Sequence, residues 1–321
     1  CGRHFYPKEF VKKFIDQMSI LKLNMFHWHL TEDQGWRIEI KKYPLLTEVG
    51  SKRPYTADYD DKNPDGKPHE GFYTQEDIKE IVDYATLRHV TVVPEIEIPG
   101  HSTAALAAYP ALSCDSTKTY KVSTCWGIKE DVYCPSEFTF RFLEDVFTEM
   151  LPLFPSRYWH IGGDECPQKA WKESAFCRNL MKQKGLKSYD EIQSLFVNRV
   201  SSFLRSHGKT VIGWDEILDG GNVDGMVAQS YRGHAPAAKG IRRGHYVILS
   251  PDRWCYYNYY QADPETEPKA NSLLLTLKKA YNYYPVVDSL PELSKKYIIG
   301  AEGCVWGEFI PDVNSAEYWT F

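Results

Sequence analysis

Apolar residues recur at three- and four-residue steps in several segments of the chain, and short apolar runs follow these segments. Between Pro7 and Leu21 this spacing predicts an amphipathic helix with one buried face. The next apolar run, residues 24–30, has the length and composition of a buried strand. The same alternation continues along the chain, so helices and strands are predicted to follow each other in turn.

Three further helices are predicted over residues 74–89, 136–151 and 189–207. Thr74 is the expected N-cap of the first, and Asp77, three residues later, completes a pattern close to a capping box. The predicted strands occupy residues 24–30, 90–96, 158–161, 210–214, 226–229, 246–249 and 297–302. Seven apolar strands separated by helical segments predict an α/β fold with a parallel sheet covered by helices.

Most predicted strands end in polar or aromatic side chains, which favours a (β/α)8 TIM barrel. In a barrel these strand ends converge on one mouth, whereas a doubly wound open sheet, the alternative, would divide them between two edges. No Gly-x-Gly-x-x-Gly follows the first strand, so a dinucleotide site is not supported. Arg3 and His4 resemble residues just past a strand, so we expect the eighth strand to precede Cys1. Residues 1–321 are thus predicted to form one barrel domain trimmed at both ends, with Phe321 inside the last helix.

Composition and charge exclude several classes of protein. The 321 residues are 43% hydrophobic and 25% charged, the balance of a folded globular protein. A net charge of -5 gives no electrostatic support for a nucleic-acid or anionic-membrane partner. No apolar stretch approaches the roughly 18 residues of a membrane-spanning helix.

The eight cysteines are scattered and include no Cys-x-x-Cys pair, so zinc-ribbon and redox signatures are absent from the sequence. Two interpretations stay open. The cysteines are either buried free thiols or form one or two disulfides of an exported protein. The second rests on Cys114, Cys125 and Cys134, which share one loop-like segment, and on Cys166, which lies eleven residues before Cys177.

The sharpest local signal is the segment from His160 to Glu165, which follows a predicted strand. Its paired glycines permit a tight turn and a close backbone approach to a ligand. Asp164 and Glu165 are adjacent acids whose repulsion is expected to raise the pKa of one of them, as a general acid requires. The alternative is a surface acid pair stabilised by a helix dipole, but the flanking histidine and glycines favour a pocket.

Aromatic residues accompany these acids and suit a sugar ring, which presents C–H bonds on one face and hydroxyls at its edge. They are Trp214, Tyr231, Trp254, Tyr256, Tyr257, Tyr259, Tyr260 and Trp306. Core packing is the alternative, but Trp214 and Trp306 each lie at a strand end and are followed by an acid within two residues. Metal ligation to which His27, His29 and His160 contribute is a further alternative. No third ligand has a recognisable spacing, so no metal site and no cofactor are expected.

Together these motifs resemble the catalytic barrel of the family-20 glycoside hydrolases, the β-N-acetylhexosaminidases, over nearly the whole chain. The matching segments, in the family's order, are Arg3–Phe5, His27–His29, Asp33–Arg37, Glu95–His101, His160–Glu165, Gly213–Glu216 and Trp306–Glu308. The resemblance implies a retaining reaction in which the substrate's own 2-acetamido oxygen attacks the anomeric carbon. Glu165 would be the general acid and then the base, and Asp164 would orient the acetamido group and stabilise an oxazolinium-like intermediate.

The resemblance also implies the surroundings of these two acids. The substrate-binding set would be Arg3, Trp214, Tyr231, Tyr256, Asn258, Trp306 and Glu308, and the supporting set Glu32, Asp33, His101 and His160. Tyr256 would bond the acetamido oxygen. This chain departs from the family pattern where Tyr231 stands for Trp, Asn258 for Asp and Glu32 for Asp, and the small α/β domain that usually precedes the barrel is absent.

The expected activity is therefore that of an exo-β-N-acetylhexosaminidase acting on glycans with a terminal β-linked N-acetylhexosamine. A disaccharide-releasing member of the lacto-N-biosidase type is a close alternative. A conventional two-carboxylate glycosidase using Asp164 or Glu216 as nucleophile, and a sugar-binding barrel without catalysis, are the more distant ones. Export from the cytoplasm is expected because glycan polymers are external substrates.

Overall fold

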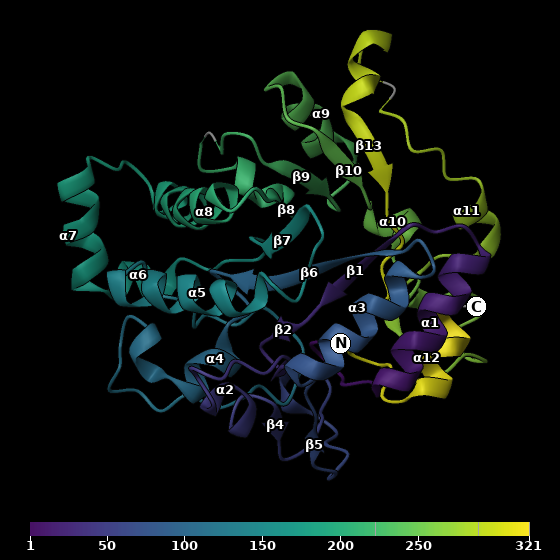
Figure 1. Ribbon diagram of the computed structural model, residues 1–321, viewed down its shortest axis with the longest axis horizontal. Helices are drawn as coiled ribbons and strands as arrows, with labels where there is room; N and C mark the ends of the chain where they lie inside the picture. The colour runs from purple at the N-terminus through teal and green to yellow at the C-terminus, as the bar shows by residue number, and fades with distance from the viewer. Residues whose placement is uncertain (222, 288, 321) are drawn as a thin grey trace.

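A curled parallel sheet of seven strands forms the centre of the protein in the computed structural model, which describes residues 1–321 except 222, 288 and 321 (Figure 1). The strand order is β1-β6-β7-β8-β9-β10-β13, and every neighbouring pair is parallel. The strands are β1 (Met25–His29), β6 (Thr91–Ile98), β7 (Tyr158–Gly162), β8 (Thr210–Trp214), β9 (Val227–Ser230), β10 (Val247–Leu249) and β13 (Ile298–Ala301). Each lies within two residues of its predicted bounds.

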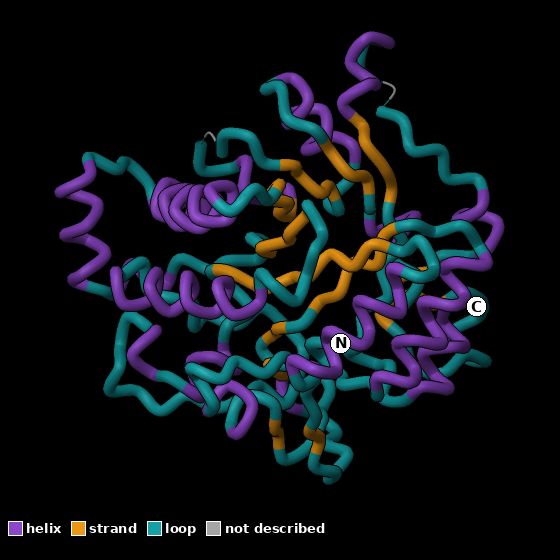
Figure 2. The backbone as a smooth tube through the Cα atoms, viewed as in Figure 1, coloured by secondary structure: helices purple, strands orange, loops and turns teal. Residues whose placement is uncertain are grey.

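Helices surround this sheet, and Figure 2 shows the strands as a central layer enclosed by helical segments. The long helices pack on the strands that they connect: α3 contacts β6, α8 contacts β8, and α9 contacts β9 and β10. The helices are α1 (Lys8–Ile20), α2 (Leu45–Glu48), α3 (Gln75–Thr86), α4 (Thr103–Ala108), α5 (Glu137–Met150), α6 (Lys169–Glu173), α7 (Ala175–Lys184), α8 (Tyr189–Ser206), α9 (His234–Arg242), α10 (Asp252–Cys255), α11 (Leu277–Tyr281) and α12 (Val313–Thr320). The four helices predicted from periodicity are confirmed as α1, α3, α5 and α8.

Three small sheets, which the hydrophobic pattern does not predict, lie outside the central one. They are the hairpins β2 (Thr31–Glu32) with β3 (Gly35–Trp36) and β4 (Lys52–Arg53) with β5 (His69–Glu70), and the parallel pair β11 (Tyr259–Tyr260) with β12 (Asn271–Leu274). Most of these strands have two residues, too few for an alternating pattern to show. Strand β2 of the first hairpin, which carries Glu32, contacts β6.

The register of the central sheet determines which side chains meet at its carboxyl ends. His29 on β1 pairs with Glu95 on β6, and Glu95 pairs with His160 on β7. Ile98 and Gly162 are paired further along the same two strands. Parallel strands in register bring residues distant in sequence into one row, so ionisable groups of three strands form a line beneath the mouth.

The eighth strand expected before Cys1 stays a prediction. Within the described residues, β1 and β13 are the outer strands of the sheet, and each has one neighbour. Phe321, expected inside the last helix, lies outside those residues. Among the helices that the structure describes, none is both long enough and apolar enough to span a bilayer.

The capping box of α3 gives a test of local stability. Thr74 accepts a hydrogen bond from the backbone N–H of Asp77 (3.0 Å), and Asp77 accepts one from the Thr74 N–H (3.1 Å). We expect Thr74→Ala to lower the free energy of unfolding by about 1 kcal/mol, because it removes an N-cap acceptor. Urea denaturation measures the change. Thr86→Ala, at the other end of the helix, is the matched control, and an equal loss there would contradict the capping role.

Candidate active site

Asp164 and Glu165 lie directly after β7, on a turn that requires glycine. Gly162 and Gly163 have φ values of +67° and +99°, and Glu165 itself has φ +43°. A Cβ on Gly162 would lie 1.7 Å from Oε2 of Glu97. The Asp164 residue is 9% exposed, whereas the Glu165 side chain is 27% exposed. The turn therefore buries the first acid and leaves the second open to an approaching ligand.

His101, from the loop after β6, lies between this acid pair and a second one. Its Nε2 is 3.4 Å from Oδ2 of Asp164 and 3.5 Å from Oε2 of Glu165. Its Nδ1 is 3.3 Å from Oε2 of Glu32 and 3.2 Å from Oδ2 of Asp33. Burial opposes protonation, but the carboxylates, Glu32 and Asp164 above all, outweigh it and hold the pKa of His101 well above its usual range. The ring is therefore an imidazolium with an acid pair at each nitrogen.

The pKa of Asp164 is raised, and this acid is not Glu165, the general acid expected from the family resemblance. Burial is the main cause of the raised pKa; the nearby His101 opposes the shift and the charge of Glu165 adds to it. The Oδ1 atom of Asp164 is buried and has no hydrogen-bond partner in the described part of the protein. This oxygen is therefore available to accept a hydrogen bond from a ligand.

Arg3 connects the supporting acids to the substrate-binding residues implied by the family resemblance. Its Nε donates a hydrogen bond to Glu32 Oε1 (3.0 Å), and its Nη1 donates one to Glu308 Oε2 (2.7 Å). The guanidinium lies 4.6 Å from the ring centre of Trp306. Asn258, 2% exposed, donates to the other oxygen of Glu308 (3.3 Å). The structure thus brings these four substrate-site residues into one group.

Four aromatic rings form a wall beside the acids. Trp214 contacts Tyr231 edge to face, with ring centres 5.6 Å apart, and its ring centre is 5.7 Å from that of Trp306. Tyr256 stacks on Tyr231 at 6.3 Å and lies 5.8 Å from Trp306. The indole nitrogen of Trp306 is buried and has no partner in the described residues. Trp254, also in the predicted aromatic set, instead stacks on His234.

Glu216 lies next to this wall and is held as a neutral acid. The Tyr231 hydroxyl donates to its Oε1 (2.5 Å). Burial and the neighbouring charges of Asp164 and Asp215 raise the pKa of Glu216 to about 8. At neutral pH most of this carboxyl group is protonated, so it is a poor nucleophile.

His160 belongs to a buried row below the mouth and, in the described residues, has no contact with Glu165. Its Nδ1 is 2.7 Å from Oε1 of Glu95, which also accepts a hydrogen bond from the Trp214 indole (3.0 Å). His27 Nε2 lies 2.9 Å from the other oxygen of Glu95. The Nδ1 atom of His160 also accepts a hydrogen bond from the Gly162 N–H (3.1 Å), at the start of the turn that carries both acids. The supporting role expected for His160 beside Glu165 stays a prediction.

The central position of Glu95 in this buried row is not predicted from the sequence. His27, Glu95 and His160 place ligand atoms within 4.8 Å of one another, as do His29, Glu95 and Glu97. The third ligand, which local spacing did not reveal, is Glu95. The register of β6 with its neighbouring strands places it beside the histidines. Alternation along β6 was the available signal, since Glu95 and Glu97 face the same side of that strand. That this row holds no metal stays a prediction.

A parallel α/β fold whose strand ends gather an acid pair, a buried imidazolium and an aromatic wall defines a barrel of the glycoside hydrolase class. The chain belongs to glycosyl hydrolase family 20, since residues 1–321 match the catalytic domain of that family. Both the barrel prediction and the family prediction are confirmed.

Curated relatives and solved structures support the same assignment. The chain is 45% identical to a β-hexosaminidase of Porphyromonas gingivalis over 98% of its length and 40% of the relative's, and 37% identical to one of Vibrio furnissii over 99% and 53%. It thus spans about half the length of these relatives. A solved β-N-acetylhexosaminidase superposes with a TM-score of 0.90 at 32% identity, covering 100% of this chain and 67% of the other. A Vibrio harveyi exo-β-N-acetylglucosaminidase in complex with N-acetylglucosamine gives 0.86 at 33% identity, covering 100% and 51%.

Two glycines with the same backbone angle separate conformational strain from steric exclusion at the site. Gly162 and Gly185 both have φ +67°, but only Gly162 lacks space for a Cβ. We expect Gly185→Ala to lower the free energy of unfolding by about 1–2 kcal/mol. Gly162→Ala should cost about 1–3 kcal/mol more, because Glu97 must move. Urea denaturation of both variants measures the difference, and equal losses would contradict the close packing of Gly162 on Glu97.

Proposed function

We propose that this chain is the catalytic barrel of an exo-β-N-acetylhexosaminidase that removes terminal N-acetylglucosamine or N-acetylgalactosamine from glycans. The observation that carries the proposal is the buried Asp164, whose free Oδ1 lies in a site walled by aromatic rings and next to the more exposed Glu165. A buried carboxylate with an unused acceptor suits the N–H of an acetamido group. The solved relative bound to N-acetylglucosamine supports this choice of ligand.

In the proposed reaction, Glu165 donates its proton to the glycosidic oxygen as the bond to the anomeric carbon breaks. The acetamido oxygen forms the new bond to that carbon, while Asp164 accepts the amide N–H and stabilises the positive charge of the oxazolinium-like intermediate. Glu165 then takes a proton from water, which attacks the anomeric carbon and restores the acetamido group. Good orientation of this internal nucleophile supplies up to roughly 7–11 kcal/mol of the barrier.

The other side chains bind and shield the sugar in this proposal. Tyr256 donates to the acetamido oxygen, and Trp214, Tyr231 and Trp306 enclose the acetamido group, which delays the entry of water until the aglycone leaves. Arg3, Glu308 and Asn258 hold hydroxyls of the terminal sugar. Glu32, Asp33 and His101 support the acid pair through the ring nitrogens of His101.

The two-carboxylate mechanism receives less support. Glu216 accepts a hydrogen bond from the Tyr231 hydroxyl, and its pKa is raised to about 8. A nucleophile needs the ionised carboxylate. Trapping with a 2-fluoro sugar distinguishes the two mechanisms, since a labelled carboxylate would contradict substrate assistance.

The related alternatives concern the aglycone and the place of action. Release of an intact disaccharide from a tetrasaccharide would indicate a lacto-N-biosidase type of enzyme in place of the exo activity. We also propose that the protein acts outside the cytoplasm, because its glycan substrates are found there. Cell fractionation with an antibody to the chain tests this localisation.

The first functional test compares hydrolysis of an aryl β-N-acetylglucosaminide with that of an aryl β-glucoside. We expect cleavage of the N-acetyl substrate alone, because only it carries the internal nucleophile. Glu165→Gln should lower kcat by about 10²–10⁴-fold for a poor leaving group. Glu173→Gln, on the exposed end of α6, is the matched control and should retain activity.

Each contrary outcome has a definite meaning. Equal cleavage of both substrates would point to an enzyme nucleophile and overturn the acetamido mechanism. Binding of N-acetylglucosamine without cleavage of either substrate would support the sugar-binding barrel. Full activity of the Glu165→Gln variant would remove Glu165 from the role of general acid.

A further inference from the structure

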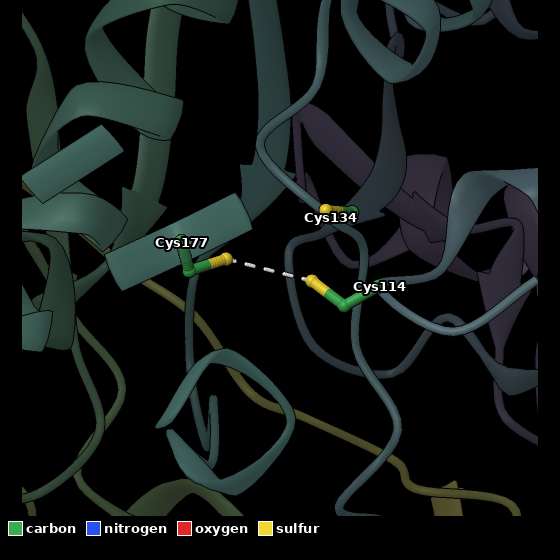
Figure 3. A group of neighbouring side chains, drawn as sticks. All are labelled: Cys114, Cys134 and Cys177. Atoms are coloured by element: carbon green, nitrogen blue, oxygen red, sulfur yellow. Dashed lines mark hydrogen bonds between the residues drawn. The ribbon is translucent and has the colours of Figure 1, made fainter. Parts of the chain in front are cut away.

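Three cysteines from separate segments converge at one point beside the barrel (Figure 3). Cys114 lies in the segment between α4 and α5, Cys134 shortly before α5, and Cys177 in the first turn of α7. Their sulfur atoms all lie within 4.8 Å of one another, and those of Cys114 and Cys177 are 3.5 Å apart. All eight cysteines are free thiols in this structure, and neither Cys125 nor Cys166 belongs to the group.

The separation of the sulfurs fits a shared metal ion better than a disulfide. Tetrahedral zinc with Zn–S bonds of about 2.3 Å separates its sulfur ligands by about 3.8 Å. A disulfide would use two of the thiols and leave the third beside it, whereas an ion uses all three. Cys134 and Cys177 are 4% and 0% exposed, and they pack with Val132, Trp171 and Ile192 in an apolar cluster. Such a closed pocket is typical of structural metal sites.

Ser174 lies next to the three thiols. It is the N-cap of α7, 9% exposed, and its hydroxyl accepts a hydrogen bond from the Cys177 N–H (3.3 Å). The same hydroxyl is a hydrogen-bond partner of the thiols of Cys114 and Cys177. Its three-residue offset from Cys177 equals that of paired zinc ligands within one loop. The start of a helix also favours the thiolate form of Cys177.

We propose that Cys114, Cys134 and Cys177 bind one Zn²⁺ ion, with the Ser174 hydroxyl oxygen in the fourth position. Binding releases the three thiol protons to solvent, so the site changes from three neutral thiols to three thiolates around a divalent cation. Three thiolates and a closed tetrahedral geometry select zinc over calcium or magnesium, which prefer oxygen ligands. The proposal goes beyond the hydrolytic function and does not depend on it.

The cysteine group lies next to hydrogen bonds that connect two segments of the active site. Tyr133, next to Cys134, donates its N–H to the carbonyl of Pro99 (3.0 Å), two residues before His101, and accepts a bond from the Trp171 indole of α6 (2.9 Å). α6 and α7 follow Glu165 in the chain. An ion at this point therefore ties the loop that carries His101 to the segment that follows Glu165, and its ligands are positioning residues.

Metal analysis of the purified protein tests the site. Reduced wild-type protein supplied with zinc should retain about one equivalent after gel filtration, and cobalt in its place should give a thiolate-to-metal charge-transfer band. Cys134→Ser and Cys177→Ser should each lose the ion and the band. Cys125→Ser, in the same loop as Cys114 but outside the group, should retain both.

Two further measurements keep the test decisive where a cysteine variant fails to fold. Ser174→Cys should bind zinc at least about tenfold more tightly in chelator competition, because sulfur replaces a neutral oxygen ligand. In the wild type, zinc should protect Cys114, the one partly exposed thiol of the group, from alkylation, as mapped by mass spectrometry. The proposal is overturned if reduced protein takes up no zinc, if zinc leaves the alkylation of Cys114 unchanged, or if Cys114 and Cys177 are isolated as a disulfide.

Parallel assay of aryl substrate hydrolysis separates this proposal from the proposed function. Hydrolysis by a protein that takes up no zinc would contradict only the metal site. Zinc uptake without hydrolysis would contradict only the proposed function. If the ion positions His101 and Glu165, its removal should lower kcat and leave the form of the pH profile unchanged.

Discussion

His101 lies buried between two pairs of carboxylates, and the geometry of the barrel mouth depends on the charge of its ring. A buried cation is costly unless it is paired, and a buried acid cluster is costly without a cation. Glu32 and Asp33 hold one ring nitrogen, while Asp164 and Glu165 face the other. Because Glu32 also accepts a hydrogen bond from Arg3, the charge of one imidazole couples the acid pair to the residues proposed to bind sugar hydroxyls.

A second charged row supports the aromatic wall from below. Glu95 accepts the indole N–H of Trp214 and faces both His27 and His160. A tryptophan whose nitrogen is bound in this way cannot rotate freely, so its orientation within the aromatic wall is fixed. The strands thus position the aromatic wall, and the loops after them carry the acids. Barrel enzymes usually build their sites from strand ends and the loops that follow them in this way.

Sequence alone predicted the elements that depend on local order. Apolar runs located the seven central strands, and the offset of Thr74 and Asp77 located the start of α3. Asp164 and Glu165 were found because they are neighbours in the chain. Partners that depend on sheet register or on loop packing were not found: Glu95 meets His160 only through β6–β7 pairing, and Cys114 meets Cys177 across 63 positions. Hydrophobic periodicity along the chain carries no information about such long-range contacts.

The bond between Arg3 and Glu308 joins residues 305 positions apart. Closing a loop of that length costs about 5 kcal/mol of chain entropy before any contact forms, so this end of the sugar site is expected to assemble late in folding. During synthesis Asp164 and Glu165 are added long before Glu308. The Arg3–Glu308 ion pair therefore cannot form until the chain is almost complete to residue 321. Because the residues proposed to hold sugar hydroxyls include both Arg3 and Glu308, we expect sugar binding to require nearly all of residues 1–321.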